Sequence, residues 1–248
     1  MIIDCHTHWG PDFQERDECD PKPWLATLEK YGITHAVVMP TAGLFDDRRI
    51  QSDNNAVKKV CELSGGRMIP FCTVQTYSED EALSELGRCL GRLNFAGIKF
   101  HPWLQGIFPY GAIMDKVCEV AASFSVPIVF HDGTPPNALP SQIAMLAERH
   151  PSAQFVLGHC GLFEYWREAI DVLNRRENVW GCLCGPPWAA IRELINRCDP
   201  HQLLWGSDYG FGSDDCLSYR YTLMDRPDLS NSLRQTIFCE NPKRLLGL

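Results

Sequence analysis

The chain has 248 residues, of which 45% are apolar and 22% are charged, and these values are ordinary for a globular enzyme with a sizeable core. Its net charge is -8 and it contains no basic run, which argues against a nucleic-acid surface. It has no apolar stretch of the roughly 18 residues that a membrane span needs, and no basic segment followed by an apolar run opens the chain. We therefore expect a cytoplasmic protein.

The first segment of strand character, Ile2–Cys5, leads directly into His6-Thr7-His8. Side chains alternate faces along a strand, so this segment predicts a buried strand that carries both histidines on one face. Two imidazoles on a shared face are suitable as the first two ligands of a divalent metal. The alternative is a pair of polar residues that leave a strand, and the H-x-H pattern alone does not decide between the two.

Apolar runs of strand length then alternate with segments of helical periodicity. The expected strands are 2–8, 35–39, 69–74, 97–101, 127–131, 154–159, 179–184 and 203–208. The expected helices are 23–31, 52–64, 82–93, 113–124, 141–150, 163–174, 188–197, 216–224 and 231–246. We expect Ser78, Ser141 and either Ser52 or Asp53 to cap helices. A polar loop is expected at 9–20, an aromatic-rich loop after 102 and a Gly-rich loop after 208.

Alternation of strands and helices implies parallel strands, because each crossover must return the chain to the same end of the sheet. Eight such units without a linker predict one α/β domain over residues 1–248, a closed (β/α)8 TIM barrel. An open doubly wound sheet is the alternative. It is disfavoured because no Gly-x-Gly-x-x-Gly turn opens the first helix.

Twelve cysteines are present, and no two have C-x-x-C spacing, the nearest pair being Cys182 and Cys184. This spacing disfavours a zinc knuckle and a thioredoxin-type site. Because many cysteines fall within apolar runs, we expect them to be reduced and to act as small hydrophobic residues.

Polar side chains follow five of the predicted strands at their C-terminal ends. They are His6, His8, Lys99, His101, His131, His159 and Asp208. In a TIM barrel these ends meet on one face, where such enzymes carry their chemistry. The remaining histidines, His35, His150 and His201, lie elsewhere, and we expect no catalytic role for them.

Imidazoles and a carboxylate are typical ligands of a catalytic divalent ion, here Zn2+ first, with Mn2+ or Fe2+ as alternatives. His6, His8, His131 and Asp208 supply a complete ligand set. Such an ion lowers the pKa of bound water to about 7, and Asp208 is placed to act as general base. We expect His159 to be catalytic, either by hydrogen bonding to a substrate oxygen or by relaying a proton.

In several segments the chain resembles the amidohydrolase superfamily, in particular its amidohydrolase 2 branch of metal-dependent barrel enzymes. The matching segments are Asp4–His8, Gly97–Pro102, Val129–His131, Leu157–Gly161, Gly206–Tyr209 and Glu240–Leu248. They span the chain in the family's order. The resemblance implies a mononuclear site on His6, His8, His131 and Asp208, with His159 catalytic.

Lys99 has three interpretations. In some relatives a lysine at this position is carbamylated and bridges two metals, but this branch usually does without the carbamate. We expect instead that Lys99 or His101 binds an anionic substrate group, with a buried ion pair as the alternative.

Loop aromatics are expected to ring the site, and Trp103 and Tyr209 are the ones we assign to substrate binding. The others are Trp9, Phe108, Tyr110, Trp188 and Phe211. An apolar pocket suits a small cyclic or aromatic substrate. Packing against one another, or against the partner of a homodimer, is the alternative for these side chains.

These observations predict a metal-dependent hydrolase that acts on a small-molecule amide, lactone or ester through metal-activated water. The alternative that the same branch implies is a metal-dependent non-oxidative decarboxylase, or a hydratase, of a small carboxylic acid. The short chain favours hydrolysis slightly. A non-catalytic binding barrel would predict a broken ligand set, whereas the set here is complete.

Overall fold

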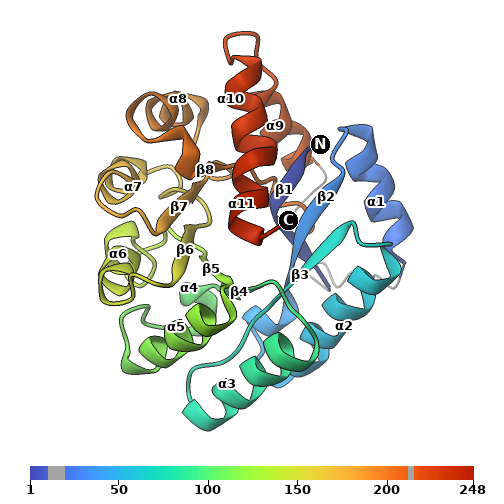
Figure 1. The fold of residues 1–248 in the computed structure, drawn as a ribbon, viewed down its shortest axis with the longest axis vertical. Coiled ribbons are helices and arrows are strands. Elements are labelled where there is room, and N and C mark those ends of the chain that lie inside the picture. The colour runs from blue at the N-terminus through green and yellow to red at the C-terminus, as the bar shows by residue number, and fades with distance from the viewer. Residues whose placement is uncertain (11–19, 212–214) are drawn as a thin grey trace.

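The computed structural model describes residues 1–10, 20–211 and 215–248. Eight parallel strands form one sheet in the order β1 to β8, with the helices around it (Figure 1). The strands are β1 (Ile3–Trp9), β2 (His35–Pro40), β3 (Met68–Cys72), β4 (Gly97–Phe100), β5 (Pro127–Phe130), β6 (Gln154–Leu157), β7 (Val179–Cys182) and β8 (Leu203–Leu204). The predicted single-domain TIM barrel is confirmed.

Backbone hydrogen bonds between the segment after β8 and β1 close the barrel. The N–H of Cys5 donates to the carbonyl of Trp205 at 2.9 Å, and the N–H of Asp208 donates to the carbonyl of His6 at 2.8 Å. The N–H of His8 donates to the carbonyl of Tyr209 at 2.7 Å. The backbone itself therefore holds Asp208 beside the two histidines of β1.

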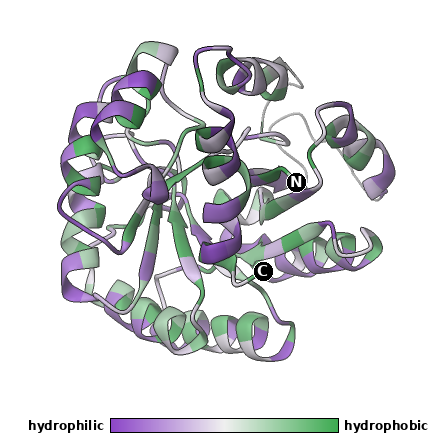
Figure 2. Ribbon diagram, turned by 45° about the horizontal axis from the view of Figure 1, so that its top comes forward, coloured by the Kyte–Doolittle hydropathy of each residue, from purple (hydrophilic) through white to green (hydrophobic). Residues whose placement is uncertain are grey.

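The helices form the outer layer. They are α1 (Pro21–Lys30), α2 (Ile50–Leu63), α3 (Glu79–Leu86), α4 (Pro102–Gln105), α5 (Ala112–Phe124), α6 (Pro140–Arg149), α7 (Trp166–Leu173), α8 (Trp188–Arg197), α9 (Asp215–Met224), α10 (Asn231–Gln235) and α11 (Asn241–Leu246). Figure 2 shows strands that are mostly hydrophobic and helices that carry both kinds of residue. One core cluster fills the space between strands and helices, and a smaller one fills the barrel interior.

A bulge in β1 directs the histidines into the barrel. The pairing of β1 with β2 shifts by one residue between Asp4 and Thr7. Cys5 belongs to the interior cluster, and beyond the bulge His8 pairs with Met39, which also belongs to that cluster. Strict alternation from Cys5 would have turned His8 away from the interior. The extra residue reverses that direction, as bulges near active sites commonly do.

The later strands are shorter than predicted. β4, β5, β6 and β8 end before His101, His131, His159 and Asp208, so these four residues lie in the connections that follow, whereas Lys99 lies on β4 as expected. Pro102 starts the short helix α4 instead of a loop, because proline is favoured at the first helical position. Of the predicted 9–20 loop, Trp9 is the last residue of β1, and residues 11–19 lie outside the described part, as do 212–214 of the Gly-rich loop.

The predicted helix caps have mixed outcomes. The side chain of Ser78 accepts a hydrogen bond from the N–H of Glu81, as predicted. The prediction for α2 was wrong, since this helix already begins at Ile50. The prediction that Ser141 caps α6 was also wrong, because α6 begins one residue earlier at a proline. The described cysteines are free thiols, and all but Cys216 are buried, as expected for small hydrophobic residues. Among the residues that the structure describes, no helix has the length and apolar character of a membrane span.

Asp53 on α2 is a buried carboxyl with a testable effect on stability. Its side chain is 4% exposed and accepts a hydrogen bond from the N–H of Gly43 at 2.8 Å. Burial raises its pKa from 3.8 to about 6. The folded chain therefore binds a proton here that the unfolded chain has released, so this group's contribution to stability falls as the pH rises from about 4 to about 6.

We expect Asp53→Asn to remove this pH dependence. Urea titrations of both proteins at pH 4 and pH 7 measure the free energy of unfolding, and wild type should lose up to about 3 kcal/mol more than the variant over this interval. Asp47→Asn, which alters an exposed carboxyl before the same helix, is the control. Parallel pH profiles for wild type and Asp53→Asn would contradict the assignment.

Candidate active site

His6, His8 and Asp208 bring three ligand atoms together at the mouth of the barrel. Oδ1 of Asp208 lies 3.4 Å from Nε2 of His6 and 3.5 Å from Nε2 of His8. Ligands about 2.0–2.1 Å from one tetrahedral ion are separated by roughly 3.3 Å. The three side chains fit one divalent ion with little movement, and their N/O donor set suits Zn2+, Mn2+ or Fe2+.

The ring of His8 is oriented for ligation. Its Nδ1 lies 3.2 Å from the carbonyl of Pro40, and because a carbonyl can only accept, Nδ1 carries the proton. Nε2, which faces Asp208, is therefore unprotonated. Burial and the nearby Lys99 both lower the pKa values of His6 and His8, so both rings stay neutral.

Asp208 occupies a strained backbone conformation. Its φ is 62°, in the left-handed region that non-glycine residues seldom adopt, although aspartate and asparagine tolerate it better than most. The hydrogen bond from its own N–H to His6 holds it there. Backbone strain of this kind is concentrated at functional sites.

Lys99 supplies a cation to the same space. It is fully buried on β4, and its Nζ lies 3.1 Å from Nε2 of His6. Burial lowers the pKa of Lys99 to about 8, although the nearby Asp208 carboxylate opposes this shift. For Asp208 the effects are reversed, since burial raises its pKa and Lys99 lowers it. The site thus holds a buried ammonium and a half-buried carboxylate.

A second group of rings adjoins the first. The ring centroid of His159 lies 4.6 Å from those of both His6 and His131. The ring of His131 stacks on that of His101, with 3.8 Å between the ring centroids. Nε2 of His131 is hydrogen-bonded to Oγ1 of Thr134 at 2.8 Å. The compact group of ligand atoms on His6, His8 and Asp208 does not include His131. Its role as a fourth ligand therefore stays a prediction.

The two aromatics assigned to substrate binding differ in their surroundings. Trp103 is 57% exposed on α4, and the ring of Tyr209 packs on Trp24 at 5.4 Å. Phe211 is the loop aromatic that meets the site, with its ring 4.8 Å from that of His8 and 6.1 Å from that of His101. Substrate contacts by Trp103 and Tyr209 remain predictions.

Two buried aspartates that the sequence analysis did not single out hold the backbone of the site. Asp4 accepts hydrogen bonds from the N–H groups of His6 and Ser207, at 3.1 and 3.0 Å. Asp132 accepts from the N–H groups of His159 and Gly161, at 2.6 and 2.5 Å. Their closeness in sequence to His6 and His131 was the available signal, but side-chain bonds to remote backbone carry no sequence pattern.

Solved structures with the same fold include enzymes of three kinds. One is a dihydroxybenzoic acid decarboxylase from Polaromonas with bound manganese and the inhibitor 2-nitroresorcinol (TM-score 0.76, 16% identity, 100% of this chain and 97% of the relative). Another is a probable 2-pyrone-4,6-dicarboxylic acid hydrolase from Acinetobacter baumannii with citric acid bound (0.73, 17%, 100% and 99%). The third is a 4-oxalomesaconate hydratase from Rhodopseudomonas palustris (0.75, 15%, 100% and 96%).

These likenesses, at such low identity, establish the fold. No curated protein matches the chain in sequence. The sequence profile of the amidohydrolase family, by contrast, matches residues 3–248, which is nearly the whole chain and contains every residue of the site described above. The chain therefore belongs to the amidohydrolase family, in its amidohydrolase 2 branch.

Proposed function

We propose that this protein is a metal-dependent hydrolase that cleaves an amide, lactone or ester bond of a small molecule. The observation that carries the proposal is the convergence of His6, His8 and Asp208 at ligand spacing, beside a buried lysine. This arrangement offers neutral nitrogen ligands, a carboxylate and a fixed positive charge within one water-poor space. Metal-assisted hydrolysis of a polar bond can use all three.

His6, His8 and Asp208 would hold the ion, with His131 as the proposed fourth ligand and Zn2+ as the first choice. The manganese of the Polaromonas relative keeps Mn2+ as an alternative. A divalent ion held by these residues would polarise a substrate carbonyl and would make hydroxide available near neutral pH.

The remaining catalytic roles belong to side chains of this protein. Asp208 is the general base that takes a proton from the attacking water, and burial strengthens it as a base by raising its pKa. Lys99 attracts the negative charge that develops on the substrate or holds a substrate carboxylate. His159 moves a proton between the site and the substrate. One wall of the site is aromatic and consists of Phe211, His101 and His131.

Metal removal tests the proposal directly. Chelation should abolish turnover, and returned Zn2+ or Mn2+ should restore it. The metal-free protein should also gain thermal stability on metal addition, by about 2.7 kcal/mol when the free metal is at 100 times its Kd. His8→Asn should lose this gain, whereas the exposed control His201→Asn should keep it. Full activity of metal-free protein, or an equal gain in His8→Asn, would count against the proposal.

Non-oxidative decarboxylation of a small carboxylic acid is the second candidate. The stacked rings of His101 and His131, at an interplanar angle of 11°, favour it because they offer a flat surface to a planar acid near the Lys99 ammonium. A panel of lactones, esters and amides assayed for acid release, together with aromatic acids assayed for carbon dioxide release, separates the two candidates. Carbon dioxide release without any hydrolysis would replace the first candidate with the second.

A further inference from the structure

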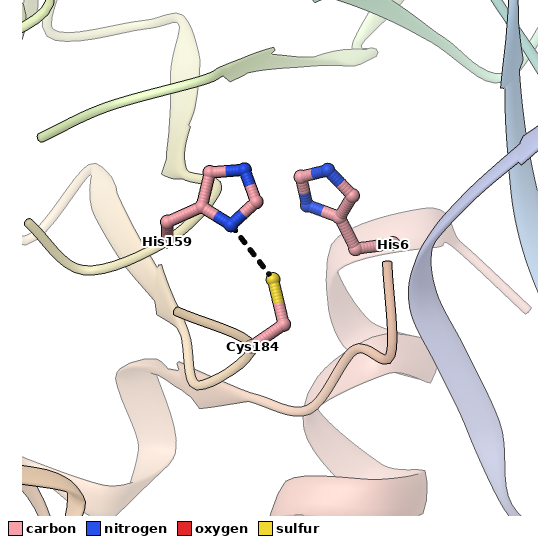
Figure 3. Close-up of side chains that lie close together, drawn as sticks. All are labelled: His6, His159 and Cys184. Carbon is pink, nitrogen blue, oxygen red and sulfur yellow. Dashed lines mark hydrogen bonds between the residues drawn. The ribbon is translucent and has the colours of Figure 1, made fainter. Parts of the chain in front are cut away.

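Cys184 lies against the ring of His159. It follows β7 by two residues and is fully buried. Its Sγ lies 2.8 Å from the carbonyl oxygen of Gly158 and 3.1 Å from Nδ1 of His159. Figure 3 shows the sulfur beneath this nitrogen, with the second ring nitrogen of His159 on the side away from the sulfur and with His6 opposite.

These two contacts assign the protons. A carbonyl oxygen has no proton to give, so the single proton of the thiol is donated to Gly158. The sulfur can then only accept from the imidazole, so Nδ1 of His159 must carry a proton. In the neutral ring the other nitrogen, Nε2, is left with its lone pair.

The backbone segments that carry Cys184 and His159 pack closely together. Gly185 follows Cys184 directly, and a Cβ at this position would lie 2.3 Å from the carbonyl oxygen of His159. The N–H of His159 is itself bound to Asp132 at 2.6 Å. The two loops therefore pack backbone to backbone, and the Cys184–His159 contact is built into that packing.

We infer that Cys184 is a positioning residue that fixes His159 in the tautomer with Nδ1 protonated, so that His159 enters the reaction as a proton acceptor at Nε2. The catalytic use of this tautomer rests on the proposed function, whereas the tautomer itself rests on the hydrogen bonds alone. Of the two roles predicted for His159, the inference selects proton relay over donation of a hydrogen bond to the substrate.

A metal site at the same place is the competing interpretation, since ligand atoms of His6, His159 and Cys184 lie within 4.8 Å of one another. Metal binding requires a thiolate. A thiolate 2.8 Å from a carbonyl oxygen would be repelled, whereas a thiol at this distance is a donor. Burial also raises the pKa of Cys184, which favours the thiol.

Two substitutions separate positioning from packing. Cys184→Ser keeps a donor for Gly158 and an acceptor for Nδ1 of His159, whereas Cys184→Ala removes both. Cys118→Ala removes an equally buried thiol from α5 and is the matched control. All four proteins are compared with Zn2+ bound, because this ion is diamagnetic and leaves the NMR signals sharp.

The test is nitrogen-15 NMR of the histidine side chains, with the His159 signals identified by their absence in His159→Gln. Wild type, Cys184→Ser and Cys118→Ala should show Nδ1 protonated and Nε2 unprotonated. Cys184→Ala should shift His159 toward the tautomer protonated at Nε2. Protonated Nε2 in wild type, unchanged signals in Cys184→Ala, or loss of bound metal in Cys184→Ala would each overturn the inference.

Kinetics on a substrate from the panel provide a second readout. Cys184→Ala should lower kcat by about 10- to 100-fold at similar KM and change the pH profile of kcat, and Cys184→Ser should restore most of the rate. Equal kcat values in Cys184→Ala and wild type would contradict the positioning role. Because the NMR measurement needs no substrate, it can succeed even if the hydrolase proposal fails.

Discussion

The Asp208→Asn variant is expected to lose turnover by about 10²- to 10⁴-fold, the usual contribution of a general base. The amide keeps the shape of the carboxyl group but cannot accept a proton from water. It also keeps the fold, because asparagine tolerates the left-handed φ of 62° as well as aspartate does. An alanine at this position would add backbone strain to the chemical loss, so Asp208→Asn is the cleaner test.

Asp171→Asn, which makes the same change on the exposed face of α7, is the matched control. It should match wild type in turnover, in metal content and in thermal unfolding. Metal content also divides the two roles of Asp208. If Asp208→Asn keeps its metal, the loss of rate reports the base, and if it binds metal more weakly, the ligand role contributes as well. Undiminished turnover with bound metal would contradict the base assignment.

The meeting of His6, His8 and Asp208 could be anticipated because the barrel topology leaves the chain little choice. Parallel strands joined by crossovers place all their C-terminal ends on one face, so polar residues that follow different strands must meet there. His6 and Asp208 come from opposite ends of the sequence, yet Nε2 of His6 lies 3.4 Å from Oδ1 of Asp208. The two side chains meet because β1 and the segment after β8 are neighbours. The prediction needed only the positions of these residues relative to apolar runs.

Other features could not be predicted because they depend on contacts without local sequence signals. The bulge in β1 is an example, since the alternation of Ile3, Cys5 and the residues that follow looks regular until β2 fixes the register. The packing of Tyr209 on Trp24 depends on where α1 lies. The contact of Cys184 with His159 joins two loops whose approach follows only from the closed barrel.

Close approach of backbone segments also explains why Gly206 is required beside the site. A Cβ at this position would lie 2.5 Å from Cβ of His6 and 2.8 Å from Sγ of Cys182. Gly206 does not have a positive φ, so an alanine here would meet a steric obstacle and no backbone strain. The obstacle is the first side-chain atom of a proposed metal ligand, and it cannot move without moving the imidazole.

We therefore expect Gly206→Ala to lower the free energy of unfolding by about 1–3 kcal/mol, the usual cost of overpacking, and to weaken metal binding as well. Gly87→Ala is the control, because a Cβ there has no neighbour within 4 Å. It should be neutral or should stabilise by about 0.5–1 kcal/mol, since it replaces a glycine within a helical segment.

Urea unfolding and metal titration of both variants check the expectation. Adding Cys182→Ala to Gly206→Ala removes one of the two overlaps and should recover part of the stability, while the contact with His6 and the weakened metal binding remain. If Gly206→Ala unfolds and binds metal as Gly87→Ala does, the backbone of His6 moves more freely than the packing implies. The ligand geometry would then not depend on the close passage of β1 and the segment after β8.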